Sequence, residues 1–262
     1  MNNRFIVYVT YNNAEKYLHD CLSSIYSQDY DNFKLIIIDD ASTDNSDNIV
    51  KNFDQNKILY YIKNKENLYK LQNVAMAFNK FDLDDEDILL LIDGDDKLTH
   101  ENVLNQLNKV YEKNNILVTF GSFISSDGKI NLHDKILENN FDNLRKDPFV
   151  FSHLKTFKYK CFKEIEKQDN KLKCFKDNKN KFYTMTDDVA IMLPIIEIAG
   201  IDKTFYDNRI HYFYRLHDRN DSKINKCLQT SIKYEIFGKK KFNLKNFEEK
   251  WYDLYRKQTN KS

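Results

Sequence analysis

The sequence has little of several residue types that would mark particular classes of protein. It contains five glycines, two prolines and one tryptophan, too few Gly and Pro for a collagen-like or proline-rich low-complexity chain. No apolar run approaches the roughly 20 residues that a membrane span needs. The apolar run Phe5–Val9 is too short for a signal peptide. We therefore expect no integral membrane segment and a cytoplasmic location.

The sequence also lacks an excess of either charge sign and closely spaced pairs of cysteines. The chain has 41 Lys and Arg against 40 Asp and Glu, a net charge of +1, whereas nucleic-acid-binding proteins usually have a basic surplus. No C-x-x-C pair signals a zinc or redox site. The cysteines are therefore interpreted as small core residues of a reduced protein. They are Cys21, Cys161, Cys174 and Cys227.

What the sequence does have is an alternation of two periodicities in residues 1–125. Short apolar runs of strand length are separated by segments with apolar residues at helical spacing. Strand–helix alternation predicts an α/β fold with a Rossmann-like, doubly wound, mostly parallel sheet. The predicted strands are Phe5–Val9, Leu35–Ile38, Leu59–Ile62, Ile88–Ile92 and Ile116–Phe120. The predicted helices cover about 15–27, 43–53, 74–81 and 103–110, with Ser42 or Thr43 and Thr99 as candidate caps.

Residues 126–262 are less regular, and we interpret them as the second half of one continuous domain. His153–Ile165 is predicted to be an amphipathic helix, Val189–Ile198 is a second apolar block, and Arg209–Leu216 alternates as a strand does. The basic, aromatic end, Lys239–Ser262, either docks its aromatic rings on the core or touches a membrane surface or a partner. Docking is the favoured interpretation. The sequence leaves a homo-oligomer possible.

Acidic residues follow two of the predicted strands. Asp39 and Asp40 end the second strand, and Asp93-Gly94-Asp95-Asp96 ends the fourth. Ligands of open α/β sheets bind at the carboxyl ends of the strands. Gathered carboxylates repel one another unless a cation intervenes, and Mg²⁺ or Mn²⁺ with a phosphate suits oxygen ligands. Gly94 leaves room for a ligand near the backbone. The plainer interpretation is a solvated acidic turn.

Three segments in this order and spacing resemble the family 2 glycosyltransferases with the GT-A fold: VTYN at 9–12, IDDASTD at 38–44 and IDGDD at 92–96. The resemblance covers about the first 125 residues. It implies that 1–125 binds a nucleotide sugar, usually a UDP-sugar, with a divalent metal, usually Mn²⁺ or else Mg²⁺. It further implies that 126–262 binds the acceptor.

The resemblance also implies roles for single residues. Thr10 and Tyr11 would contact the nucleobase, and Asp39 would accept a hydrogen bond from uracil. Asp93 would bind the ribose or a metal-bound water, and Asp95 would ligate the metal that bridges the diphosphate.

Two further candidates follow the third strand. By the same resemblance Asn67 would touch uracil and Lys70 would approach the diphosphate. The family often has Gly shortly after this Asn, whereas this chain has Leu68-Tyr69. The alternative interpretation is that Asn67 caps a helix and Lys70 is a solvated lysine.

The second half contributes three more candidates. Family members carry an acidic pair at a helix start, which corresponds to Asp187-Asp188 and makes Asp188 the general base. A carboxylate there also simply stabilises a helix N-terminus. By the resemblance, His217 corresponds to a further metal ligand; the alternative is an ordinary surface or core histidine. Arg215 corresponds to a diphosphate contact; the alternative is an exposed charge. His211 is interpreted as structural.

The function predicted from these residues is a metal-dependent, inverting glycosyltransferase. It would move a hexose from a UDP-sugar, with UDP-glucose or UDP-galactose as the expected donor, to a hydroxyl of a glycan or of a hydroxylated or sugar-bearing protein. One rival is a phosphohydrolase with Asp93 as nucleophile, disfavoured because Lys97 stands where a Thr is usual. A NAD-dependent oxidoreductase lacks its G-x-G-x-x-G. A catalytically idle sugar-nucleotide- or glycan-binding module is the non-enzyme alternative.

Overall fold

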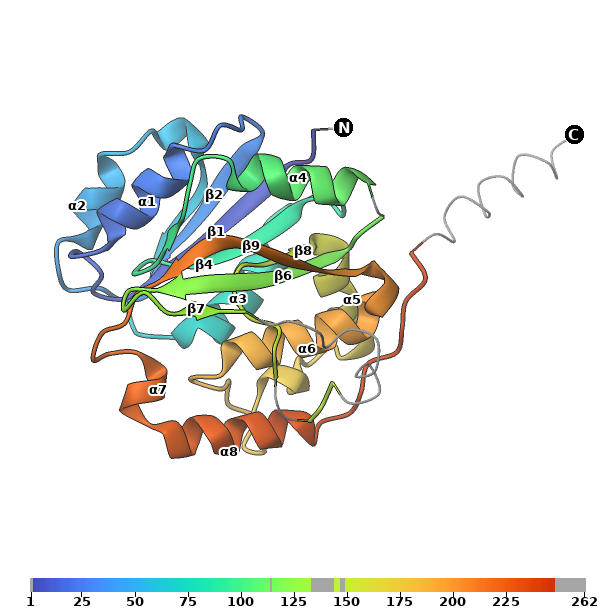
Figure 1. Cartoon of the computed structure of the whole chain (residues 1–262). Coiled ribbons are helices and arrows are strands. Elements are labelled where there is room, and N and C mark those ends of the chain that lie inside the picture. Colours follow the sequence, from blue (N-terminus) through green and yellow to red (C-terminus); the bar gives the residue numbers. More distant parts are fainter. Residues whose placement is uncertain (1, 114, 133–143, 147–148, 248–262) are drawn as a thin grey trace, which may run out of the picture.

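The computed structural model describes residues 2–113, 115–132, 144–146 and 149–247. Within them the strands form one sheet in the order β3-β2-β1-β4-β8-β6-β9-β5, with β7 paired to β6 (Figure 1). The strands are β1 Phe5–Tyr11, β2 Phe33–Asp39, β3 Ile58–Lys63, β4 Ile88–Asp93, β5 Lys97–Leu98, β6 Val118–Ser125, β7 Ile130–Asn131, β8 Lys155–Lys158 and β9 Thr204–Tyr214. The predicted α/β fold class and each of the five predicted strands are confirmed.

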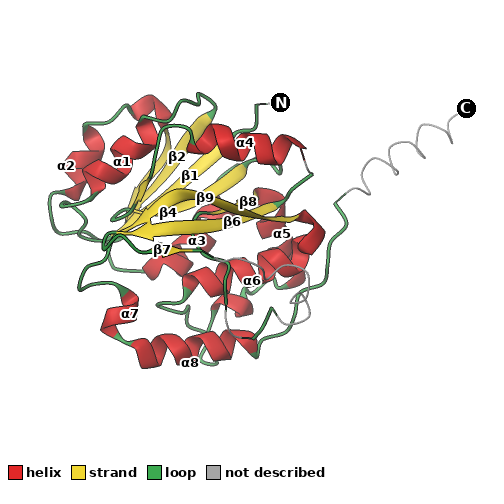
Figure 2. Cartoon of the chain, viewed as in Figure 1, coloured by secondary structure: helices red, strands yellow, loops and turns green. Residues whose placement is uncertain are grey.

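Helices cover both faces of the sheet (Figure 2). One apolar layer joins the sheet to α1, α2 and α4, and the other joins it to α3, α5, α6 and α8. The α-helices are α1 Leu18–Tyr26, α2 Ser46–Lys51, α3 Tyr69–Lys80, α4 Val103–Lys113, α5 Tyr159–Gln168, α6 Asp187–Ala199, α7 Asp221–Ile224 and α8 Lys226–Phe237. Because both faces are covered, the central strands are apolar on both sides, as the sequence pattern predicts.

The sheet is mixed rather than purely parallel. β1 pairs with β2 and β4 in parallel, and β2 pairs with β3 in the same way. β8 then inserts between β4 and β6 and runs antiparallel to both. A strand from the second half of the chain therefore completes the middle of the sheet, next to the strand that carries the acidic turn.

The predicted helix at His153–Ile165 is wrong in its first part. Lys155–Lys158 forms β8, and the helix α5 begins at Tyr159. The apolar residues have helical spacing, but the backbone of this segment bonds to strands on both sides. The Thr156 hydroxyl also lies 2.7 Å from that of Tyr111 and 2.6 Å from that of Thr119. Pairing with distant strands overrides the local periodicity.

The predicted helix caps are also wrong. Neither Ser42 nor Thr43 begins α2; the Ser42 hydroxyl accepts a hydrogen bond from the backbone N–H of Asn13, and the Asn13 side chain accepts one from Thr43. The Thr99 hydroxyl donates to the Ile210 carbonyl instead of capping α4. Ser, Thr and Asn side chains hydrogen-bond to backbone groups in loops as readily as at helix ends. Residue type alone therefore does not locate a helix cap.

Three of the four cysteines are buried, as predicted, whereas Cys227 is exposed. In the carboxyl-terminal segment Phe242 is buried and Phe247 packs against the core, which agrees with docking. The remaining predicted docking residues, Trp251, Tyr252 and Tyr255, lie outside the described residues. Among the described helices, none has the length and apolar character needed to cross a membrane.

A buried ion pair ties this segment to the core. The Arg145 guanidinium donates to both carboxylate oxygens of Glu197 on α6, at 2.6 and 2.8 Å. The same guanidinium donates to the carbonyls of Ile236, Phe237, Lys239 and Lys240. Glu197 also accepts the backbone N–H of Phe242 at 2.9 Å. The pair therefore holds the end of α8 and the chain after it against α6.

A second buried carboxylate, Asp207 on β9, gives a testable pH dependence. Burial alone would raise the pKa of Asp207, but hydrogen bonds with His211 and Arg209 outweigh it and hold the pKa well below its usual value. A lowered folded-state pKa stabilises the protein above the unfolded value of about 4, and that stability is lost as pH falls below it. Asp207→Asn should therefore lower the free energy of unfolding by about 1.5–3 kcal/mol at pH 7, and the accompanying fall in Tm should be largest there.

The measurement for Asp207 is thermal unfolding of wild type and variant between pH 3 and 8. The difference in Tm should narrow as pH falls below about 4. A difference that stays constant over this range would contradict the assignment.

Candidate active site

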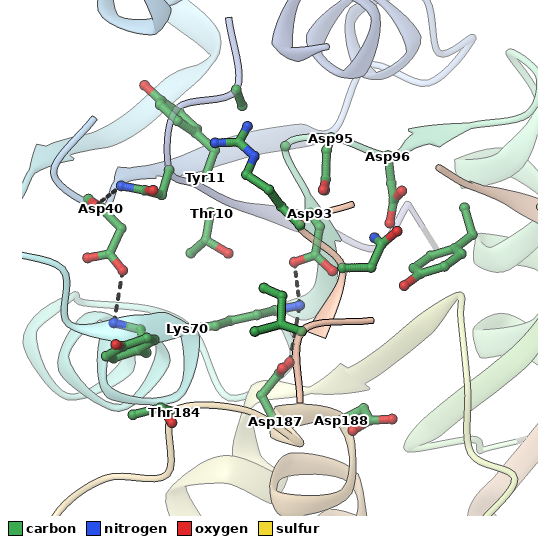
Figure 3. A pocket seen from close by; sticks show the side chains of 18 of the residues that line it. Thr10, Tyr11, Asp40, Lys70, Asp93, Asp95, Asp96, Thr184, Asp187 and Asp188 are labelled. Carbon is green, nitrogen blue, oxygen red and sulfur yellow. Dashed lines mark hydrogen bonds and ion pairs between the residues drawn. The ribbon is translucent and has the colours of Figure 1, made fainter. Parts of the chain in front are cut away.

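A cavity of about 470 Å³ opens at the carboxyl ends of β1 and β4, where the helices α3 and α6 begin. Most of the residues predicted from sequence line it (Figure 3). They are Thr10, Tyr11, Asn67, Lys70, Asp93, Gly94, Asp95, Asp188 and His217. Asp39 and Arg215 do not line it. Residues from both halves of the chain therefore meet at one place.

The ends of β1 and β4 are packed closely together. The backbone N–H of Gly94 donates to the Thr10 carbonyl at 2.9 Å. A β-carbon at position 94 would lie only 2.6 Å from Cβ of Tyr11. Glycine is therefore required here by the contact with Tyr11, a more specific reason than general space for a ligand.

Of the two aspartates that follow β2, the structure places Asp40 on the cavity and not Asp39. Asp39 is fully buried; its Oδ1 accepts the backbone N–H of Ser42 at 2.7 Å, and its Oδ2 lies 3.4 Å from the Lys63 ammonium. Asp40 accepts the backbone N–H groups of Leu68 and Tyr69, both at 2.9 Å. The Asp39 side chain therefore closes its own turn and does not line the cavity, whereas Asp40 does.

Asn67 lies on the cavity at the start of α3. Its Oδ1 accepts the backbone N–H of Tyr69 at 3.0 Å, whereas the N-cap residue of α3 is Leu68. Asn67 is also one of the residues that line the cavity. A contact with a base remains a prediction.

Lys70 joins two carboxylates across the cavity. Its Nζ lies 2.5 Å from Oδ1 of Asp93 and 3.2 Å from Oδ2 of Asp187, and the lysine side chain is 14% exposed (Figure 3). Lys70 is therefore not a solvated lysine. Burial would lower its pKa, but the charges of Asp187 and Asp93 outweigh burial and raise it, so Lys70 carries a positive charge here.

Asp95 and His217, which the resemblance implies to be metal ligands, contact each other. His217 Nε2 lies 2.6 Å from Asp95 Oδ2, and the imidazole stacks on the Tyr17 ring at 5.5 Å between centroids. Within the described residues, no three His, Cys, Asp or Glu side chains gather into a complete metal site. One carboxylate oxygen and one imidazole nitrogen are nevertheless donor types that Mn²⁺ accepts, so the pair fits part of such a site. Asp93 is engaged by Lys70 instead.

Arg215 contacts the acidic turn after β4. Its Nε donates to the Asp95 carbonyl at 2.8 Å, and its backbone N–H donates to Asp96. Its guanidinium lies 4.7 Å from the Tyr17 ring centroid. Arg219 lines the cavity in its place, and its guanidinium donates to the Asn13 carbonyl.

Asp188 stands at the first turn of α6. Its Oδ1 accepts its neighbour's backbone N–H, that of Val189, at 2.8 Å, so the helix N-terminus does stabilise it. It lines the cavity at the same time. Burial raises the pKa of Asp188, and the charge of Lys155 opposes that rise. A carboxylate with a raised pKa in a cavity is suited to accept a proton.

Sequence reasoning missed several residues of the cavity wall. Asp40 was missed because the sequence does not show which of the two adjacent aspartates, Asp39 or Asp40, the turn after β2 directs toward the cavity. Lys155 lay inside a predicted helix, and the α8 residue Gln229 lay in a segment with no motif. The carbonyl of Gln229 accepts the Thr186 hydroxyl at 3.2 Å, which brings α8 against the start of α6.

The family whose sequence model matches the chain is described as Glycosyl transferase family 2, and the match covers residues 5–171. A curated relative, Glycosyltransferase GlyA from Streptococcus pneumoniae, is 25% identical over 234 residues. That alignment covers 86% of this chain but 32% of the relative, so this chain spans about a third of the relative's length.

Two solved structures share the fold. S. aureus TarS 1–349 in complex with UDP-GlcNAc superposes with a TM-score of 0.60 at 17% identity, covering 85% of this chain and 61% of that one. The mannosyltransferase PcManGT from Pyrobaculum calidifontis, in complex with GDP-Man and Mn²⁺, superposes with a TM-score of 0.58 at 17% identity. That superposition covers 84% of this chain and 59% of the neighbour.

Proposed function

Because the chain belongs to glycosyl transferase family 2, we propose that it transfers a hexose from a nucleotide sugar to an acceptor hydroxyl. The observation that carries the proposal is the meeting of Asp95, His217 and Asp188 around one cavity at the carboxyl ends of β1 and β4. In the proposed arrangement the nucleotide lies along β1 and the acceptor enters beside α6.

The proposed donor is a UDP-sugar. In this proposal Thr10, Tyr11 and Asn67 offer the base polar groups near an aromatic ring, and Asp40, which lines the same cavity, takes the role expected of Asp39. The TarS structure holds UDP-GlcNAc, which supports a uridine nucleotide, whereas PcManGT holds GDP-Man. UDP-glucose and UDP-galactose remain the first donors to test.

Asp95 and His217 would hold a divalent cation, with Mn²⁺ as first choice because one ligand is an imidazole. Such an ion stabilises the charge that develops on the leaving diphosphate. Lys70 and Arg219 line the same cavity and add positive charge near the diphosphate. Lys70 would also keep Asp93 in place through their ion pair.

The proposed reaction is a single inverting displacement. Asp188 takes the proton of the acceptor hydroxyl, whose oxygen forms a bond to the anomeric carbon. The bond from that carbon to the diphosphate oxygen breaks, and UDP leaves with the electron pair. The acceptor would be a glycan or a hydroxylated or sugar-bearing protein.

The test is a screen of nucleotide sugars with and without Mn²⁺ by thermal shift, followed by a transfer assay with the best donor. A ligand that binds only the folded state raises the Tm by mass action. NMR of the product would report the anomeric configuration, and retention would contradict the inverting proposal. No response to any uridine or guanosine nucleotide would contradict the donor assignment.

Asp95→Asn isolates the contribution of the cation. The variant should bind UDP with at least about 10-fold lower affinity in Mn²⁺, because it loses one of two protein donors, and should differ little from wild type in EDTA. Isothermal titration calorimetry measures both. The matched control is Asp202→Asn, an exposed aspartate away from the cavity. Equal UDP affinities of variant and wild type in Mn²⁺ would exclude Asp95 as a ligand.

A further inference from the structure

Lys155 is a buried lysine in the middle of the sheet. The strand registers place Tyr8 of β1 beside Leu91 of β4, and Leu91 beside Lys155 of β8. Tyr8 and Leu91 belong to the apolar layer under α3 and α6, and directly paired residues of neighbouring strands share a face. Lys155 therefore points toward the starts of α3 and α6, and it lines the cavity while only 1% exposed.

Without Lys155, three carboxylates at this point of the cavity would face a single ammonium group. The Lys70 ammonium is shared by Asp93 and Asp187, which leaves Asp188 as a third carboxylate. An isolated buried carboxylate is unfavourable and takes up a proton unless a positive charge lies nearby. Lys155 is the second ammonium group on the same cavity wall.

We propose that Lys155 is a positioning residue, whose buried ammonium group holds Asp188 in the ionised form that accepts the proton of the acceptor. The inference rests on the proposed function of Asp188 as base. Lys155 acts through Asp188 and needs no contact with the reacting atoms.

The electrostatic environments of the two groups are reciprocal. Burial raises the pKa of Asp188, and the largest opposing influence is Lys155. Burial lowers the pKa of Lys155, and Asp188 is the largest opposing influence on it. The other charged or histidine side chains that line the cavity are Asp40 after β2, Lys70 on α3, Asp93, Asp95 and Asp96 at the end of β4, His153 before β8, Asp187 on α6, and His217 and Arg219 after β9.

A second role for Lys155 makes a different prediction. A buried lysine beside an acceptor site could bind an anionic group of the acceptor, such as a phosphate or carboxylate. Loss of that contact would raise KM for the acceptor at every pH. Loss of support for Asp188 would instead move the pH at which the base becomes protonated.

The experiment compares Lys155→Met and Lys155→Gln, which remove the charge, with Lys155→Arg, which keeps it. The kcat/KM for acceptor is measured from pH 5 to 9 at saturating donor. In the uncharged variants the acid limb should move up by about one pH unit or more, so that activity at low pH falls about 10-fold further than activity at pH 9. Arg should restore the limb. Lys109→Met, an exposed lysine on α4, is the matched control.

The inference is overturned if the uncharged variants lose activity equally at all pH values, or change only KM for the acceptor. A readout without turnover separates it from the proposed function. This readout is ¹³C NMR of protein with labelled Asp carboxyl groups, in which the Asp188 signal is identified by its loss in Asp188→Asn. The Asp188 carboxyl should titrate at higher pH in Lys155→Met than in wild type. If Asp188→Asn keeps full turnover, the assignment of the base fails, whereas an unshifted carboxyl titration refutes the Lys155 inference alone.

Discussion

Asp188→Asn is expected to lower the rate of sugar transfer by about 10²–10⁴-fold. An asparagine of the same shape cannot take the proton of the acceptor hydroxyl, whereas its Oδ1 can still accept the backbone N–H of Val189 that Asp188 accepts now. Burial already disfavours the charged form of this carboxylate, so the substitution should leave the protein folded. The affinity for UDP should stay within about 2-fold of wild type, because the proposed arrangement places the nucleotide along β1 and the acceptor beside α6.

The measurement is single-turnover transfer together with calorimetric binding of UDP in Mn²⁺. Asp202→Asn again serves as the control for loss of an exposed carboxylate. A transfer rate of Asp188→Asn within a few-fold of wild type would exclude Asp188 as the general base. Loss of both transfer and UDP binding would show that the substitution had disturbed the donor side of the cavity.

Glu197→Gln should produce the largest loss of stability, about 3–5 kcal/mol of unfolding free energy. The Glu197 carboxylate is fully buried. It accepts two hydrogen bonds from Arg145 and one from the backbone N–H of Phe242. Glutamine keeps the volume but removes the charge, so the Arg145 guanidinium, whose side chain is 18% exposed, remains beside α6 without its counter-charge.

For a chain of this length, that loss corresponds to a fall in Tm of about 6–20 °C, measured by calorimetry or circular dichroism. Glu66→Gln, at an exposed position, should change the Tm by less than about 2 °C. A replacement of Glu197 and Arg145 by Met and Leu together should recover part of the loss, because a buried pair is often replaceable by apolar side chains. An unchanged Tm for Glu197→Gln would mean that the ion pair does not hold the chain after α8.

The first half of the chain was predictable because its signals are local. In β1 and β4 apolar residues run without interruption between polar turns, and α1 and α4 place their apolar residues on one face. The rule that ligands bind at the carboxyl ends of parallel strands then leads from these elements to Asp93 and Asp95. The cavity lies at that edge of the sheet.

What escaped prediction depends on pairing between distant parts of the chain. Lys155–Lys158 becomes a strand because β4 and β6 lie on either side of it, and no feature within the segment reveals those neighbours. The choice between Asp39 and Asp40 depends on how the strand end turns toward Ser42. Nothing in the sequence distinguishes the roles of Arg215 and Arg219, which differ through contacts with distant residues: Arg215 contacts Asp95 and the Tyr17 ring, and Arg219 contacts Asn13.

The antiparallel insertion of β8 has a consequence for how the chain reaches this shape during synthesis. Domains generally fold as units as the chain emerges from the ribosome. β4 is made early, yet its outer edge has no partner until Lys155–Lys158 has been made. An open edge is a template for unwanted pairing with other chains. A nascent chain that stalls before β8 therefore presents that edge next to its acidic turn, and a fragment cut at residue 125 would aggregate instead of binding nucleotide by itself.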